Sequence, residues 1–197
     1  MGSDCDDFDI FLASRSPRRR ELLAQVGIRY RLVDSEIQEI PGPDEKPVDF
    51  VLRMAREKAH AGKGLIDSCQ DKPVLGADTA VVVNNEILGK PSDRQHGLDM
   101  LARLSGKTHQ VMTAVALLHA GDTRTRVNIS QVTFRKLNLG ECEDYWQTGE
   151  PVDKAGAYAI QGRAAVFITN LEGSYSGVMG LPLYETTELL KECGIKP

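Results

Sequence analysis

LASRSPRRRELL, residues 12 to 23, joins a short apolar segment to a helical pattern. Residues 8–12 predict a buried strand, and the apolar residues after the loop recur at helical spacing. Ser16 suits the N-cap position, and Pro17 suits the first helical position because its missing N–H would have no partner there. We therefore predict a strand, a tight loop and a helix from Pro17 to about Val26.

The start of this helix offers groups that attract anions. Free backbone N–H groups and the positive end of the helix dipole favour negative charge, and phosphates bind well at such ends. Hydroxyl and guanidinium groups surround it, from Ser14, Ser16, Arg15, Arg18, Arg19 and Arg20. This predicts a phosphate site, although a solvated arginine face with a merely capping serine stays open as the alternative. Neither G-x-x-x-x-G-K-[ST] nor G-x-G-x-x-G occurs, so the site is not a Walker or dinucleotide-binding loop.

Length and composition bound the class of protein. The 197 residues suffice for one domain, residues 1–197, with one core or two lobes around a central cleft. The net charge of -4 argues against non-specific binding to nucleic acid or to an anionic membrane. No stretch approaches the roughly 18 apolar residues of a membrane span, and the acidic N-terminus lacks an apolar signal segment. We expect a cytoplasmic protein with no nucleic-acid or membrane partner.

The cysteines are scattered along the chain, at Cys5, Cys69, Cys142 and Cys193. No C-x-x-C pair occurs, and no histidine pair stands at metal-ligand spacing. We therefore expect all four to be reduced thiols in a reducing compartment.

A second informative stretch is the apolar run Val74–Val83, which is typical of a strand buried on both faces. Asp78 interrupts it, and burying a lone carboxylate costs several kcal/mol unless a cation, a metal or hydrogen bonds offset it. A functional carboxylate in a cleft is favoured over one that bonds a nearby turn. Asn84 and Asn85 predict a two-residue hairpin turn, after which Lys90 would return on the strand paired with that of Asp78.

The remaining elements follow from apolar spacing and capping residues. Ser92 and Gln95 fit a capping box at the start of a helix, and a change of apolar phase predicts a bulge near Ser130. Three other predicted strands span 30–35, 86–91 and 164–170. Two more form a hairpin: one runs from 109 to the turn at 121–122, and its partner runs from that turn to about 137. The other predicted helices span 48–62, 92 to about 104, 141–147 and 181–192. Two hairpins make the sheet mixed, so we expect an α/β fold: a mixed twisted sheet with flanking helices and a ligand cleft.

Several motifs stand in a fixed order along the chain. They are L-A-S-x-S-P-R-R at 12–19, G-A-D-T at 76–79, G-K-P at 89–91, L-S-G at 104–106, D-K-A-G-A-Y with I-Q-G within 153–162, and G-L-P at 180–182. Together they closely resemble the Maf family of nucleoside triphosphate pyrophosphatases. The resemblance implies an inosine-triphosphatase-like fold with a deep cleft, a divalent metal (Mg²⁺ or Mn²⁺), and hydrolysis of a nucleoside triphosphate to the monophosphate and pyrophosphate. It also makes a homodimer an expectation.

The resemblance gives individual residues expected roles. Asp78 would take the proton from a water that attacks the α-phosphorus. The phosphates would be clamped by Ser14, Ser16, Arg19, Lys58, Lys90 and Lys154. The base would be read by Arg18, Thr79 and Gln161, which match the family branch that acts on dTTP and UTP rather than the branch that prefers 7-methyl-GTP.

The metal would be held in the acidic loop by Glu36 or Glu39 and by phosphate oxygens. The family carries adjacent acids in this segment, but Gln38 precedes Glu39 here, and we favour Glu39 by its alignment with the second acid.

Two other functions compete with this hypothesis. The family's association with septum formation motivates a nucleotide-binding regulator of cell division that acts without turnover. Asp78 argues against it, because a pure binder of anions gains nothing from a carboxylate beside the phosphates, whereas a hydrolase needs a base. An enzyme that clears damaged purine nucleotides would share the fold, but the S-P-R-R and I-Q-G motifs argue against it.

Overall fold

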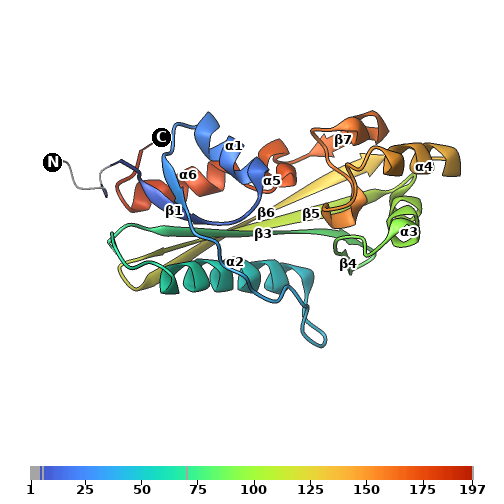
Figure 1. Ribbon diagram of the computed structural model, residues 1–197. Helices are drawn as coiled ribbons and strands as arrows, with labels where there is room; N and C mark the ends of the chain where they lie inside the picture. The colour runs from blue at the N-terminus through green and yellow to red at the C-terminus, as the bar shows by residue number, and fades with distance from the viewer. Residues whose placement is uncertain (1–4, 6, 70, 197) are drawn as a thin grey trace.

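The computed structural model describes residues 5, 7–69 and 71–196, and its centre is a seven-stranded mixed sheet (Figure 1). The sheet order is β2-β1-β3-β5-β6-β7, with β4 paired to β3. The strands are β1 (Ile10–Ala13), β2 (Tyr30–Leu32), β3 (Val74–Val83), β4 (Glu86–Leu88), β5 (Thr108–His119), β6 (Asp122–Phe134) and β7 (Ile168–Glu172). The α-helices are α1 (Pro17–Gln25), α2 (Pro47–Gly64), α3 (Arg94–Leu104), α4 (Leu139–Gln147), α5 (Tyr175–Met179) and α6 (Leu183–Glu192). Two 3₁₀ helices, η1 (Ala155–Ala157) and η2 (Arg163–Phe167), complete it, and the predicted α/β class is confirmed.

The pairing of β3 creates an opening in the sheet. One edge of β3 pairs antiparallel with β5, and the other edge pairs parallel with β1 up to Gly76 and antiparallel with β4 from Val81. In the part of the chain that the structure describes, no strand pairs with 77–80 on that second edge. The C-terminal ends of β1 and β4 therefore converge on the middle of β3, where Asp78 lies.

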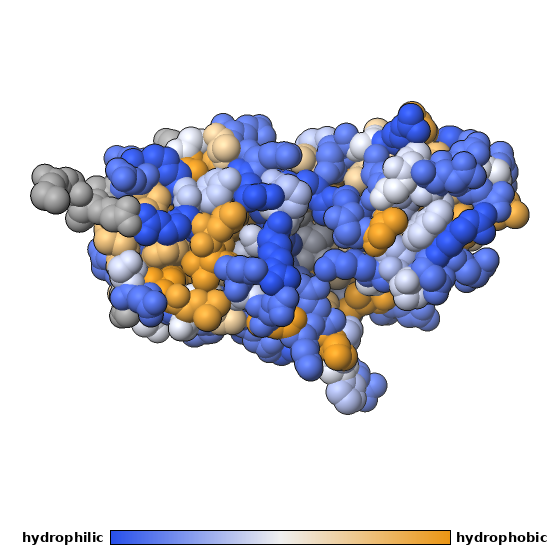
Figure 2. All heavy atoms as spheres, viewed as in Figure 1, coloured by the Kyte–Doolittle hydropathy of each residue, from blue (hydrophilic) through white to orange (hydrophobic). Residues whose placement is uncertain are grey.

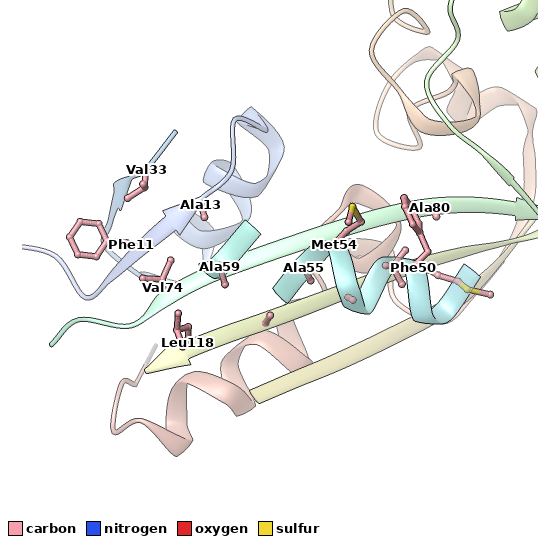
Figure 3. Packing of buried hydrophobic residues seen from close by; sticks show 14 of the residues in the cluster. Phe11, Ala13, Val33, Phe50, Met54, Ala55, Ala59, Val74, Ala80 and Leu118 are labelled. Carbon is pink, nitrogen blue, oxygen red and sulfur yellow. The ribbon is translucent and has the colours of Figure 1, made fainter. Parts of the chain in front are cut away.

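Helices cover both faces of the sheet. Figure 1 shows α2 along one face and α1 and α6 on the other, while α3 and α4 lie at the far end. A hydrophobic cluster lies under α2, and Figure 3 shows Met54, Ala55 and Ala59 of this helix over β3. A second cluster joins α1 and α6 to the opposite face, and a third packs α3 and α4 at the far end.

A glycine lets α2 lie directly on β3. A Cβ at Gly76 would lie 2.3 Å from the Ala55 carbonyl oxygen and 2.6 Å from the Ala59 nitrogen, distances that backbone atoms do not tolerate. The close approach seats the middle of α2 on the first half of β3. Lys58 is thereby placed beside Asp78.

The start of α3 differs from the prediction. Asp93 is the N-cap, because its carboxylate accepts a hydrogen bond from the His96 backbone nitrogen at 2.8 Å. The predicted capping box of Ser92 and Gln95 is therefore wrong, and the Gln95 side chain bonds Asp99 instead.

Further boundaries also differ. A capping box does occur, but at the start of α4, where Asn138 and Glu141 bond each other's backbone N–H groups. The predicted strand at 164–170 is wrong in its first half, which forms η2. The predicted last helix begins at Leu183 rather than at 181, and the five-residue α5 precedes it.

The predicted bulge near Ser130 is wrong, because β6 pairs with β5 in one unbroken register through residue 133. The change of apolar phase has another cause. Val127 packs against the cluster under α2, whereas Val132 and Phe134 point to the opposite face and belong to the cluster with α3 and α4. Different helices cover β6 along its length, so the buried face changes without an inserted residue.

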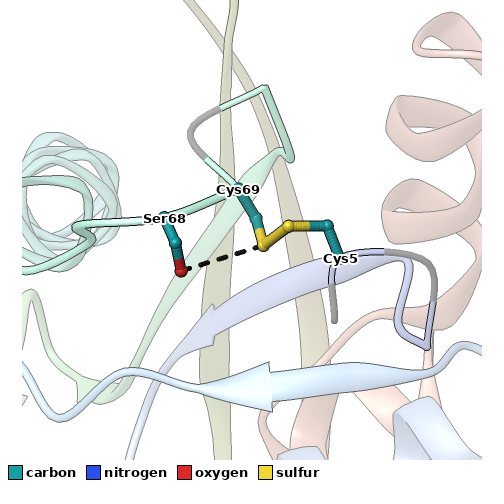
Figure 4. The surroundings of a disulfide bond; sticks show 3 residues. All are labelled: Cys5, Ser68 and Cys69. Atoms are coloured by element: carbon teal, nitrogen blue, oxygen red, sulfur yellow. Dashed lines mark hydrogen bonds between the residues drawn. A yellow bond between two sulfur atoms is a disulfide. The ribbon is translucent and has the colours of Figure 1, made fainter. Parts of the chain in front are cut away.

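The cysteine prediction needs a correction. Cys5 and Cys69 form a disulfide, with their Cα atoms 5.5 Å apart, a spacing at which such a bond forms readily (Figure 4). The bond ties the segment before β1 to the loop between α2 and β3. Cys142 and Cys193 are free thiols, as expected.

None of the helices in the described ranges combines the length and apolar character that crossing a membrane requires.

Candidate active site

The opening beside β3 leads into a cleft of about 740 Å³. Figure 2 shows a hollow near the middle of the molecule, bordered mostly by hydrophilic residues. All twelve site residues predicted from the sequence line the cleft: Ser14, Ser16, Arg18, Arg19, Glu36, Glu39, Lys58, Asp78, Thr79, Lys90, Lys154 and Gln161. They come from the β1–α1 loop, the acidic loop, α2, β3, the segment after β4 and the segment around η1.

Two carboxylates share one buried ammonium group in the cleft. Lys58 Nζ lies 2.6 Å from an Asp78 oxygen and 2.5 Å from a Glu39 oxygen. Asp78 is 6% exposed and Lys58 is 8% exposed, so water screens this contact weakly. The structure thus gives Lys58, predicted to bind phosphate, two carboxylate partners.

The two carboxyl groups differ in their pKa. Burial raises the pKa of Asp78 above its usual value, against the opposing effects of Lys58 and Arg19. Burial acts in the same direction on Glu39, but its ion pairs with Lys58 and Lys90 outweigh burial and lower its pKa. A carboxylate with a raised pKa is the better proton acceptor of the two. The strand expected to carry Lys90 is β4, which pairs with the strand of Asp78 but ends two residues earlier, and Lys90 Nζ lies 3.4 Å from a Glu39 oxygen.

Arg19 is held from three sides. Its Nε donates to the Gly180 carbonyl at 2.8 Å, and its two terminal nitrogens donate to Ser14 Oγ at 3.1 Å and Thr79 Oγ1 at 3.3 Å. Burial lowers its pKa. Each terminal nitrogen of a guanidinium carries two N–H groups, so each retains one beyond these bonds. Arg19 therefore links the β1–α1 loop to β3 and still has donors for an anion.

Arg18, its neighbour, lacks such partners. Its Nε is buried and bonds no other atom of the described residues. Burial also lowers the pKa of Arg18, against the weaker influence of Asp153 and Glu21. A buried guanidinium N–H without a partner is costly, so a ligand that accepts its hydrogen bond would remove that cost.

The two serines of the β1–α1 loop differ in the hydrogen bonds that they make. Ser14 Oγ accepts hydrogen bonds from the Ser16 backbone nitrogen at 3.2 Å and from Arg19. Ser16 occupies the N-cap position of α1 as predicted, but its hydroxyl makes no capping bond. The first turn of the helix therefore keeps N–H groups available to an anion.

Lys154 and Gln161 also line the cleft. Lys154 forms an ion pair with Asp153, and only 16% of its side chain is exposed. Gln161 is exposed and stands between Ile160 and Gly162 at the surface of the cleft.

The acidic residues offer a limited set of metal ligands. Within the described residues, no three histidine, cysteine or acidic side chains are grouped to hold an ion. Glu39 and Asp78 are close enough to share one ammonium, whereas Glu36 is 77% exposed at its side chain and pairs with Arg15 at 2.7 Å. Mg²⁺ commonly binds one or two carboxylates and completes its shell with water and substrate phosphates. Glu39 and Asp78 fit that pattern, and Glu36 fits it less well.

Sequence reasoning missed the groups that hold these residues in place. The carbonyl of Gly180 and the fully buried hydroxyl of Thr113, which bonds Thr79 at 3.0 Å, both come from other segments. The G-L-P motif was the only signal for Gly180, and nothing in the sequence marked Thr113.

Comparison with known proteins agrees with the motifs. Residues 9–193 match the family model described as Maf-like protein. The chain is 58% identical over 186 residues to a protein of Alkalilimnicola ehrlichii named dTTP/UTP pyrophosphatase, covering 93% of this chain and 92% of that protein. Proteins of the same name from Dechloromonas aromatica and Methylococcus capsulatus are 50% and 47% identical over 198 and 190 residues. These matches cover 95% and 96% of this chain, and 98% and 93% of the two relatives.

Proposed function

The chain belongs to the Maf-like protein family, and from that premise we propose that it hydrolyses dTTP and UTP to the nucleoside monophosphate and pyrophosphate. The observation that carries the proposal is a single cleft that holds a buried carboxylate, several cationic groups and the three residues that match the dTTP and UTP branch. The relatives' printed names support the same reaction.

In the proposed reaction Asp78 is the general base. It takes a proton from a water that attacks the α-phosphorus, the bond from this phosphorus to the bridging oxygen breaks, and pyrophosphate leaves. The raised pKa of Asp78 suits this role, because its carboxylate then holds the proton more firmly. Lys58 keeps the carboxylate charged and fixed in place.

The positive groups of the cleft would stabilise the triphosphate. The remaining N–H groups of Arg19, the first turn of α1, and the ammonium groups of Lys90 and Lys154 face the same space. Hydrolysis at phosphorus depends mainly on position and electrostatics, so these groups can act without a protein nucleophile. A divalent cation, Mg²⁺ or Mn²⁺, held by Glu39 with phosphate oxygens, would neutralise further negative charge.

Three residues would read the base. Arg18 has an unpartnered buried N–H, Gln161 offers both a donor and an acceptor, and Thr79 offers a hydroxyl. Uracil and thymine present two carbonyl acceptors and one N–H donor, which match this set. Buried polar groups of this kind reject a base that leaves them unpaired.

Pyrophosphate release across a nucleotide panel tests the proposal. The purified chain would be given dTTP, UTP, CTP, 7-methyl-GTP and ITP, with Mg²⁺ or with EDTA. We expect metal-dependent turnover of dTTP and UTP, and in H₂¹⁸O we expect the label in the monophosphate because water attacks the α-phosphorus. Tight binding of all nucleotides without turnover would overturn the proposal and favour a regulator that acts by binding.

A further inference from the structure

Gln161 needs support from elsewhere in the protein to hold its position. Its side chain is exposed, and no other described side chain or backbone group forms a hydrogen bond with it. Two local backbone hydrogen bonds flank its turn, from the Gly162 nitrogen to the Ala159 carbonyl and from the Ala165 nitrogen to the Gly162 carbonyl, each at 3.1 Å. The location of the amide group is therefore set by whatever holds the backbone on either side.

Two side chains hold that backbone: Tyr145 in the last turn of α4, and Glu150 three residues after the helix ends. The Tyr145 hydroxyl accepts a hydrogen bond from the Ala159 nitrogen at 3.2 Å and donates to Glu150 Oε1 at 2.6 Å. Glu150 then accepts from the Arg163 nitrogen at 2.9 Å and from the Ala164 nitrogen at 3.4 Å. One connected pair thus bonds the chain before Gln161 and after it.

The packing around this pair is tight. Tyr145 is 4% exposed, and its ring lies edge-on to Phe167 with centroids 5.2 Å apart. A Cβ at Gly162 would lie 2.2 Å from a Glu150 carboxylate oxygen, so only glycine permits this approach. The carboxylate also sits at the start of η2, where N–H groups lack helical partners and negative charge is stabilising.

We propose that Tyr145 and Glu150 are positioning residues that fix Gln161 at the wall of the cleft and thereby set selectivity for the base. This inference rests on the proposed function, in which Gln161 reads the base. Neither Tyr145 nor Glu150 lines the cleft, so their effect is transmitted through the backbone of the Gln161 turn. A displacement of a binding group by about 1 Å costs up to about 100-fold in rate. A small shift of the Gln161 turn on loss of either side chain is therefore enough to change selectivity measurably.

Two conservative variants test the proposal. Tyr145→Phe removes only the hydroxyl, and Glu150→Gln removes the charge and one of two equivalent acceptors. Each should reduce the ratio of kcat/KM for UTP over CTP by about tenfold, chiefly through KM for UTP. Tyr184→Phe and Glu143→Gln are matched controls, because Tyr184 is 73% exposed and Glu143 of α4 forms an ion pair with Arg94 rather than a bond to the Gln161 turn. Both variants should keep the ratio.

A double-mutant cycle separates positioning from general destabilisation. In a Gln161→Ala background the Tyr145→Phe change should leave the UTP over CTP ratio unchanged, because it acts through a side chain that is already absent. An equal loss of selectivity in both backgrounds would overturn the inference. If Gln161→Ala lost selectivity for UTP over CTP while Tyr145→Phe and Glu150→Gln kept it, the inference would be overturned and the proposed function would stand. Normal selectivity in Gln161→Ala would overturn the inference together with the base-reading role of Gln161, whereas the hydrolysis of dTTP and UTP is tested separately by pyrophosphate release.

Discussion

Replacing Lys58 by methionine isolates the electrostatic control of Asp78. The substitution keeps an unbranched side chain of similar length in α2 and removes the charge that lies 2.6 Å from Asp78. Two unit charges at that distance interact by about 6 kcal/mol at an effective dielectric constant of about 20. Arg19 still faces the carboxylate and water enters the cleft, so we take about half of this, roughly 3 kcal/mol, as the effective loss.

That loss converts to a shift in pKa of about 2 units, since one unit corresponds to about 1.4 kcal/mol. The direction follows from charge: without the cation, the charged form of Asp78 is less stable and its pKa rises further. A base must be deprotonated to act, so activity falls as pH drops through its pKa. The acidic limb of kcat/KM for UTP should therefore move upward by about 2 pH units in Lys58→Met.

The assay is the pH profile of pyrophosphate release for wild type, Lys58→Met and Lys58→Arg. The arginine variant keeps the charge and should keep the acidic limb near its wild-type position, whatever its maximal rate. A uniform fall in rate at every pH in Lys58→Met, with the acidic limb unmoved, would show that Lys58 does not control the pKa of Asp78. Such a result would return Lys58 to the role of a direct phosphate ligand.

Three further predictions concern stability, each measured by urea unfolding. Gly76→Ala should lower the free energy of unfolding by about 3 kcal/mol, because the new Cβ meets backbone atoms of α2. The control Gly89→Ala has no described atom within 4 Å of its Cβ and should change this free energy little. Equal losses in the two variants would contradict the close contact between α2 and Gly76. Reducing the disulfide between Cys5 and Cys69, which are 64 residues apart, should lower the free energy of unfolding by up to about 4 kcal/mol. An unchanged free energy of unfolding after reduction would argue against the disulfide. Burial lowers the pKa of His109 to about 4, so the unfolded chain binds a proton at a higher pH than the folded chain, and this site alone should lower the free energy of unfolding by about 3 kcal/mol from pH 7 to pH 4. His109→Gln should remove that part of the decline, while carboxylates with a lowered pKa, such as Glu39, keep theirs.

Local patterns in the sequence correctly predicted the elements that surround the site. The apolar run of β3 predicts its full length, and Asn84 and Asn85 both adopt the left-handed conformation that the predicted hairpin turn requires. The serine and proline at the start of α1 place that helix correctly. These signals work because strand burial, turn conformation and helix initiation depend on residues adjacent in the chain.

What sequence reasoning missed depends on contacts between distant segments. The partner of Cys69 lies 64 residues away, and no spacing rule identifies it. Lys58 meets Glu39 and Asp78 only because Gly76 lets α2 approach β3. The exposed face of β6 changes along the strand because different helices cover its two halves. In the sequence, this change of face gives the same apolar pattern as a bulge.

In the proposed reaction, Asp78 supplies the base in a cleft that hydrolyses UTP and dTTP. The most direct test is single-turnover hydrolysis of UTP by purified Asp78→Asn, an isosteric change, with folding checked by circular dichroism and nucleotide binding checked by calorimetry. We predict retained binding and a fall in the hydrolysis rate of about 100-fold or more, the usual contribution of a general base. A folded variant that binds UTP and hydrolyses it at nearly the wild-type rate would show that Asp78 is not the general base.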